Sequence, residues 1–278
     1  MLVGLSIFAY PFVSNGYYKW VQRQANQAYF EETGKQDLAN QAAIKEEMSA
    51  YNQRLAEEKY QELEMPFLKA QRENLTDSKN QELGEVLSVV EIPKIRVELP
   101  VYNGTSDLQL QYGAGLLQGT SMPIGGENSH SVITGHRGLP SAKLFTDLPK
   151  LEKGDQFYLH LQDEIHAYEV DQIKVVEPTE MDDLKIVQGE DYVTLLTCTP
   201  YMINTHRLLV RGHRVPYEKE KRLQAIHEAR LHFWLEIALY TLGVLLVILY
   251  ILWRKKRKKR QKQQQSRLET ATRKKERS

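Results

Sequence analysis

An uninterrupted apolar run near the C-terminus constrains this chain more than any other feature. Phe233 to Trp253 is a stretch of 21 residues whose only charge is Glu236. A helix rises ~1.5 Å per residue, so this segment spans ~31 Å, about the hydrocarbon thickness of a bilayer. A buried core helix of this length would show a polar stripe, which the run lacks. We therefore expect a transmembrane helix over 233–253, with the lipid bilayer as a partner.

The charge around this run predicts its orientation. The formal net charge is +1, but residues 254–278 carry 13 Lys/Arg and two Glu, a net of +11, which leaves −10 for the rest. Basic flanks stay on the cytoplasmic side, so we expect a cytoplasmic tail over 254–278 and an extracellular domain anchored to the cell membrane. The acidic body argues against nucleic-acid binding, which needs a basic face.

The N-terminal end carries a weaker apolar signal. Residues 2–13 are apolar, but the run is short for a span and Pro11 interrupts it. We expect a partial signal or anchor segment over 1–16, and either form exports the domain.

We expect a helical extension with a possible lid over 17–85, and its helical pattern runs from about residue 17 to residue 63. One helix face is predicted by apolar side chains that step by four, three and four positions. Gly34 is expected to separate this helix from an earlier one, and 64–85 is expected to be a loop. The stripe covers too few heptads for a coiled coil, so we expect it to pack against the domain. The stripe consists of Ile44, Met48, Tyr51 and Leu55.

The pattern changes to β from Val86. Apolar residues alternate with polar ones from Ile95 to Val101, the period of a half-buried strand. Gly and Pro punctuation between short strands favours an antiparallel barrel or sandwich. We predict a mainly β catalytic domain over 86–218 and a juxtamembrane helix over 219–232. No phosphate loop or metal-ligand spacing is found, so no cofactor or metal is expected. Further strands are expected at 131–134, 156–161, 167–176, 192–197 and 208–210.

Cys198 is the only cysteine, so it cannot close an intramolecular disulfide. Taken alone, a lone cysteine is better explained as a small buried core residue. It ends a predicted strand before Pro200, however, which places the thiol beside a loop where it is accessible. Arg207 begins the next strand, nine positions later. A neighbouring cation favours a thiolate and offers donors to an oxyanion, although Arg207 in isolation is better explained as a solvated charge.

A cysteine nucleophile needs a proton-transfer partner, and the chain has eight histidines. His227 and His232 flank the predicted span, and His206 should point away from the face of Arg207. His136 ends a short apolar strand at a loop, as Cys198 does. The pattern alone leaves the choice of histidine open.

Three motifs resemble those of the sortase family. TLLTC at 194–198 is similar to the segment bearing the sortase cysteine, ITGHRG at 133–138 to that of the histidine, and NTHRLLVRG at 204–212 to that of the arginine. The ordered resemblance covers 86–215 and implies an eight-stranded sortase β-barrel with an N-terminal helical extension and a C-terminal transmembrane helix. Two further similar segments are EIPKIRVELPVYNGT at 91–105 and GTSMPIGG at 119–126.

The resemblance implies a role for each of three residues. Cys198 would attack the Thr–Gly bond of an LPxTG-like sorting signal, His136 would protonate the leaving amine, and Arg207 would stabilise the oxyanion. The helical extension and the C-terminal span resemble class C sortases, which polymerise pilins in the Gram-positive cell wall by transfer to a pilin lysine. Three alternatives stay open: a housekeeping-type sortase that joins surface proteins to cell-wall peptide, a non-enzymatic membrane-anchored assembly protein, and a cysteine protease.

The class C lid motif reads Asp-Pro-aromatic, whereas this chain has Met65, Pro66 and Phe67. The resemblance implies that Phe67 covers the cysteine. Met65 cannot accept a charge-assisted hydrogen bond from the arginine, a contact worth ~1.5–3 kcal/mol. We therefore predict a looser lid or one anchored differently, for example through Glu64. An ordinary loop without a lid is the alternative.

Overall fold

The computed structural model describes residues 2–58, 63 and 83–275. The chain forms two compact units, Met1–Ile226 and His227–Ser278. The predicted lid residues Met65, Pro66 and Phe67 lie outside the described residues, as does Glu64. The lid therefore stays a prediction.

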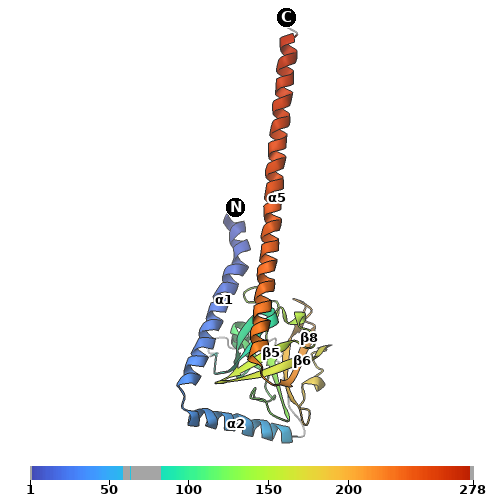
Figure 1. Ribbon diagram of the computed structural model, residues 1–278. Coiled ribbons are helices and arrows are strands. Elements are labelled where there is room, and N and C mark those ends of the chain that lie inside the picture. Colours follow the sequence, from blue (N-terminus) through green and yellow to red (C-terminus); the bar gives the residue numbers. More distant parts are fainter. Residues whose placement is uncertain (1, 59–62, 64–82, 276–278) are drawn as a thin grey trace. The chain divides into compact units, whose positions relative to one another are not determined.

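Eight strands close into a barrel in the first unit, in the order β1-β2-β3-β4-β7-β8-β6-β5 (Figure 1). The predicted eight-stranded barrel is thus confirmed. Alternate side chains of each strand enter the barrel core, as Val193 and Leu195 of β7 do. The strands are β1 Val86–Ile92, β2 Val97–Tyr102, β3 Ala114–Leu116, β4 Ser129–Thr134, β5 Gln156–Leu161, β6 Glu164–Val176, β7 Asp191–Thr199 and β8 His206–Val215.

The barrel is not wholly antiparallel. β2 pairs with β3, and β4 with β7, in parallel. The expectation of an antiparallel barrel was wrong for these two pairs. Parallel neighbours need a long crossover connection, and the chain between β4 and β7, which includes the β5–β6 hairpin, is one. The sequence pattern also missed β3 and the short helix α4, Asp107–Tyr112, which begins at a capping box formed by Ser106 and Gln109.

The strand predicted from Ile95 begins two residues later. Pro93–Ile95 forms a 3-10 turn, η1, and Arg96 adopts a left-handed φ of 54°. Ile95 is nevertheless buried, so the alternation predicted burial correctly but not the strand. The other 3-10 turns in the described residues are η2 Leu148–Lys150 and η3 Asp182–Leu184.

Two helices precede the barrel, α1 Leu2–Lys35 and α2 Leu38–Glu57. They separate just after Gly34, and Asp37 caps α2 by accepting a hydrogen bond from the backbone of Asn40. α1 crosses the predicted boundary at residue 16 without a break.

The apolar stripe of α2 packs on the barrel, as predicted. Leu55 is buried, and Met48 packs against the barrel core. Beside them, the side-chain amide of Asn52 donates to the carbonyl of Met122 (3.1 Å) and accepts from its backbone N–H (2.7 Å). This amide pair fixes α2 at one point on the barrel.

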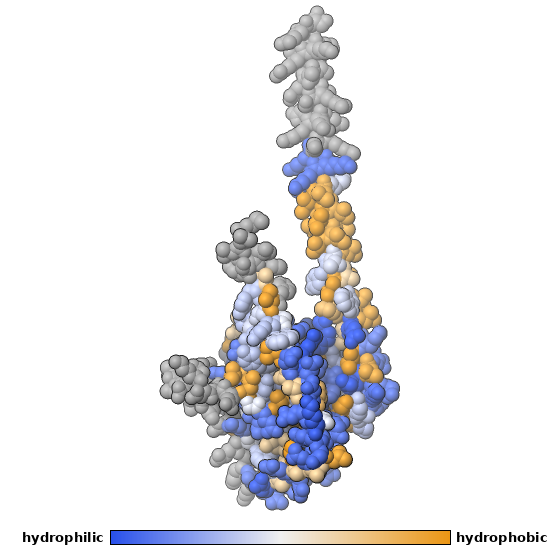
Figure 2. Space-filling view, turned by 90° about the vertical axis from the view of Figure 1, so that its left-hand side faces the viewer, coloured by the Kyte–Doolittle hydropathy of each residue, from blue (hydrophilic) through white to orange (hydrophobic). Residues whose placement is uncertain are grey.

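The C-terminal helix α5 is continuous from Lys219 to Lys275. Its most apolar window has a mean hydropathy of 2.4, and none of that window is buried. In Figure 2 the surface of this stretch is hydrophobic (orange) and is followed by a hydrophilic band (blue). The helix is therefore long and apolar enough to cross a bilayer. Within the first unit, Arg222 pairs with Glu91 at 2.7 Å and so fixes the first turns of α5 on β1.

Candidate active site

Strand register brings the predicted nucleophile and the predicted arginine together. The antiparallel β7–β8 pair sets Cys198 directly opposite Arg207. Side chains of such a pair lie on the same face of the sheet, about 5 Å apart at Cβ. The predicted juxtaposition across two adjacent strand ends therefore holds, with residues 200–205 as the connection.

The chain just after β4 brings His136 level with Cys198 and Arg207. The parallel β4–β7 register pairs Thr134 with Leu196. One residue further, the N–H of Gly135 donates to the carbonyl of Leu196 (3.0 Å), and the hydroxyl of Thr197 donates to the carbonyl of Gly135 (2.7 Å). Continuing this register sets His136 level with Cys198. The loop directly after β4, the end of β7 and the start of β8 thus place histidine, cysteine and arginine in one row.

Tight packing fixes the backbone at this point. A Cβ on Gly135 would lie 2.8 Å from Cδ2 of Phe145, so only glycine fits here without a shift. The N–H of Phe145 donates to the carbonyl of His136 (3.1 Å). The aromatic ring and the neighbouring strand therefore hold the histidine backbone from two sides.

The cysteine lies on the outer face of the barrel wall, under an apolar cover. Cys198 is 5% exposed. The expectation of an accessible thiol was wrong, because a second apolar cluster covers the outer face at this end of β7. Leu63, just before the predicted lid residues, packs partly buried against this cluster. The buried members of the cluster are Leu110, Leu117, Val132, Val176, Leu184, Leu196, Cys198 and Leu209.

Burial shifts the pKa values of both Cys198 and His136. Burial raises the pKa of the Cys198 thiol above its ordinary value of 9.0, and the Arg207 guanidinium opposes that rise. Burial also lowers the pKa of His136 below its ordinary 6.5, while the carboxylate of Asp107 opposes that shift. At neutral pH the pair is therefore mainly a neutral thiol beside a neutral imidazole, so a proton must move before or during attack.

Arg207 is buried, at 3% exposed, which excludes the solvated charge considered above. Its Nη1 donates to the carbonyls of Asn204 and His206, each at 3.1 Å. The loop between β7 and β8 thus orients the guanidinium. The imidazole of His206 instead meets Glu177 at 3.2 Å, which separates it from the row of His136 and Cys198.

Sequence reasoning missed Arg137. Its Nη1 donates to the hydroxyl of Thr199 at 2.9 Å, and its guanidinium carbon lies 5.8 Å from the ring centroid of Tyr201. Arg137 directly follows His136 and Thr199 directly follows Cys198. The bond between them therefore links the loop after β4 to the end of β7, next to the predicted active site. Its place directly after His136 in the sequence was the available signal.

Three other histidines have structural partners. His130 bonds through its two ring nitrogens to the carbonyl of Lys185 and the hydroxyl of Thr194, both at 2.8 Å, and burial lowers its pKa to about 4. His160 meets Glu91 at 2.6 Å, and His166 meets Glu164 at 3.1 Å. Within the described part of the chain, no group of three or more His, Cys, Asp or Glu is placed to hold a metal ion.

Comparisons with known proteins agree with this geometry. The sortase domain model matches residues 90–215. Sortase C1 of Streptococcus agalactiae is 47% identical, and its superposition covers 70% of this chain and 99% of that structure with a TM-score of 0.62. Sortase C of Streptococcus pneumoniae is 50% identical, with 68% and 96% covered and a TM-score of 0.60. The chain therefore belongs to the sortase family, whose members are cysteine transpeptidases.

Within the family, the solved structures it resembles are class C sortases. Curated relatives match over less of their length. Sortase A of Streptococcus agalactiae is 30% identical over 117 residues, which are 41% of this chain and 47% of that protein. The chain thus spans about half the length of this curated relative.

Proposed function

We propose that this chain is a cysteine transpeptidase that joins proteins bearing an LPxTG-like sorting signal to an amine. The observation that carries the proposal is the row of His136, just after β4, with Cys198 and Arg207 on the adjacent strands β7 and β8. A nucleophile, a proton carrier and an oxyanion donor are the three groups that acyl transfer needs, and here their backbone positions are level with one another.

The first half-reaction forms a thioester. The sulfur of Cys198 attacks the threonine carbonyl, and its proton passes to His136. The guanidinium of Arg207 donates to the carbonyl oxygen as it becomes negative. The C–N bond to glycine then breaks, and His136 gives its proton to the leaving amine. The products are a thioacyl enzyme at Cys198 and a free glycine amine.

The second half-reaction releases the enzyme. An incoming amine loses a proton to His136 and attacks the thioester carbonyl. The C–S bond breaks, an amide forms, and the thiol of Cys198 is restored. We propose that the amine is a pilin lysine, because the solved structures that the chain resembles are class C sortases, and one of them, that of Streptococcus pneumoniae, was described for its pilin substrate specificity. The product would then be an isopeptide-linked pilus shaft.

The apolar stretch of α5 supports a membrane anchor for the enzyme. It is followed by the basic run 254–260, and basic flanks favour the cytoplasmic side. We propose that the catalytic domain is extracellular and the C-terminal tail cytoplasmic, which places the barrel where cell-surface proteins arrive.

Mass spectrometry of the full chain with an LPxTG-type peptide tests the chemistry. We expect a thioacyl adduct on Cys198 that disappears in Cys198→Ala. Incubation with purified pilin then tests the acceptor, and covalent ladders are expected. An unmodified thiol in the intact protein would contradict the proposal. Transfer to cell-wall peptide without ladders would instead indicate a housekeeping-type sortase.

A further inference from the structure

A cavity of about 470 Å³ lies between the two N-terminal helices and the barrel. It is far from the predicted active site. His166 of β6 lines it, ten positions before Val176, which is the register partner of Arg207. At ~3.3 Å per residue of strand, this separation is about 30 Å. A small molecule in the cavity therefore cannot contact Cys198.

The walls of the cavity are mainly apolar, and its volume falls in the range of small-molecule sites. α1 and α2 form one side, and the starts of β1 and β6 with the turn between β5 and β6 form the other. The apolar lining includes Ala25, Ala28, Ile44, Met48, Leu87 and Ile124. This lining suits an aliphatic stem.

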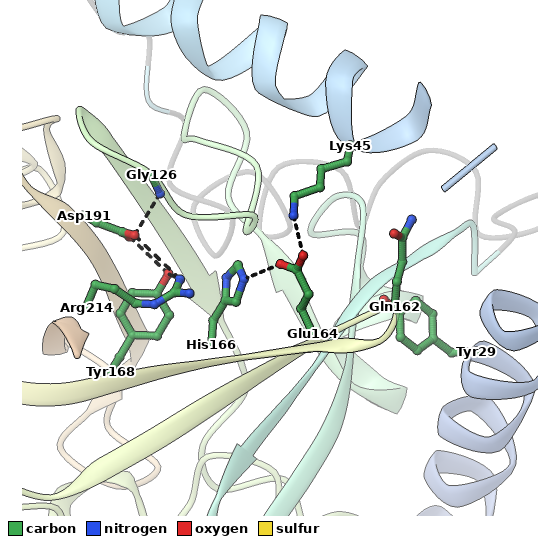
Figure 3. Close-up of polar contacts among 9 residues, drawn as sticks. All are labelled: Tyr29, Lys45, Gly126, Gln162, Glu164, His166, Tyr168, Asp191 and Arg214. Carbon is green, nitrogen blue, oxygen red and sulfur yellow. Dashed lines mark hydrogen bonds and ion pairs between the residues drawn. The ribbon is translucent and has the colours of Figure 1, made fainter. Parts of the chain in front are cut away.

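One ring nitrogen of His166, in the cavity wall, has no hydrogen-bond partner among the described residues. The side chain of His166 is only 7% exposed, and its Nε2 lies 3.1 Å from a carboxylate oxygen of Glu164. The other oxygen of Glu164 accepts from Lys45 of α2 at 2.6 Å. Figure 3 shows how Glu164 lies between Lys45 and His166 and bonds to both. Since Nε2–H donates to the carboxylate, Nδ1 is an acceptor. That atom is buried and has no hydrogen-bond partner among the described residues.

A second buried acceptor lines the same cavity. Oε1 of Gln36 is also without a hydrogen-bond partner in the part of the chain that the structure describes. The hydroxyl of Tyr29, by contrast, donates to the carbonyl of Leu87 and accepts from the N–H of Gln162. Buried polar groups are normally paired. Because both unmet groups are acceptors, a fitting ligand must bring donors.

The net charge of the residues that line the cavity indicates which kind of hydrogen-bond donor it favours. The ionised lining residues are Glu32, Glu85 and Glu164 against Lys45, three negative charges and one positive, a net of −2. A cation is therefore favoured over a neutral alcohol or an anion. An ammonium group carries three N–H donors and no acceptor, which matches the two unmet groups.

We propose that this cavity binds a primary alkylammonium group, with the head near His166 and the stem along the apolar walls. A free aliphatic diamine and a lysine side chain share this chemistry. Because α1, α2 and the barrel all contribute to the wall, the ligand also bridges the helical extension to the barrel.

Calorimetric titration of the full chain carrying Cys198→Ala tests the site. This variant has no nucleophile, so the result does not depend on the proposed transpeptidation. We expect saturable one-to-one binding of 1,5-diaminopentane and at least tenfold weaker binding of 1,5-pentanediol, which has the same skeleton without charge. Nα-acetyl-lysine amide forms the second arm, and the tighter of the two amines identifies the source of the ligand.

Two variants locate the binding. In His166→Phe, which lacks the acceptor, the dissociation constant of the diamine should rise at least tenfold. Glu32→Gln removes one lining charge and should weaken binding severalfold. Glu47→Gln removes the same charge from an exposed position of α2 outside the cavity, and its affinity should be unchanged.

If His166→Phe fails to fold, the comparison of Glu32→Gln with Glu47→Gln still tests whether the diamine binds in this cavity. Absence of saturable binding, equal affinity for the diol, or equal weakening in the two glutamate variants would each overturn the proposal.

Discussion

Gly135→Ala adds one methyl group where the end of β4 passes the ring of Phe145. The new Cβ would lie 2.8, 3.0 and 3.1 Å from three ring carbons. Ordinary carbon contacts are about 3.5–4.0 Å, so the ring or the backbone must move by about 0.5 Å or more. Overpacking of this kind costs about 1–3 kcal/mol of folding stability.

The same shift should reach the proposed active site. The N–H of Phe145 donates to the carbonyl of His136, and Gly135 is bonded to Leu196 and Thr197 of β7. Movement of the ring therefore moves the proton carrier relative to the thiol. A displacement of about 1 Å in a reacting group costs up to ~100-fold in rate, equivalent to ~2.7 kcal/mol.

Peptide cleavage by the full chain and its denaturant unfolding, measured side by side, test this reasoning. We expect Gly135→Ala to lower kcat by about ten- to a hundredfold, beyond any loss of folded protein. Gly34→Ala is the control, because a Cβ there meets nothing within 4 Å. Phe145→Leu should partly rescue Gly135→Ala by vacating the space. Wild-type stability and activity in Gly135→Ala would refute the packing argument.

Three further changes probe the row and its cover. Arg207→Gln removes the cation that opposes the effect of burial, so the pKa of Cys198 should rise, and the iodoacetamide alkylation profile should move to higher pH; an unmoved profile would show that the guanidinium does not act on the thiol. Arg137→Ala breaks the bond to Thr199, and peptide cleavage should fall severalfold while Arg137→Lys retains part of it; equal loss in both would point to a packing role. Phe67→Ala should speed alkylation of Cys198 at fixed pH if Phe67 covers the thiol, and an unchanged rate would favour a chain without a lid.

Local patterns predicted the elements that carry the site, but not how those elements pair. Cys198 and Arg207 belong to consecutive strands joined by a short loop, so their proximity follows from the chain itself. His136 reaches them only through the parallel pairing of β4 with β7, across a crossover of more than fifty residues. No periodicity reports such a pairing, which is why the histidine pattern left several candidates open. β3 has three residues, too few to show a period.

The position of Cys198 on the outer face links its burial to its reactivity. Leu195 and Thr197 occupy alternate positions on β7, so Cys198 cannot turn inward, and access to substrate must come from outside the barrel. On that side the thiol lies among apolar side chains, and burial there raises its pKa. A peptide that reaches the thiol must therefore displace part of the cover. Displacement brings polar groups and water to the site, which removes the main cause of the raised pKa. Substrate entry and nucleophile activation are, on this reasoning, one event, and alkylation of Cys198 by a small reagent should accelerate when a non-cleavable LPxTG analogue is bound in a way that leaves the thiol uncovered.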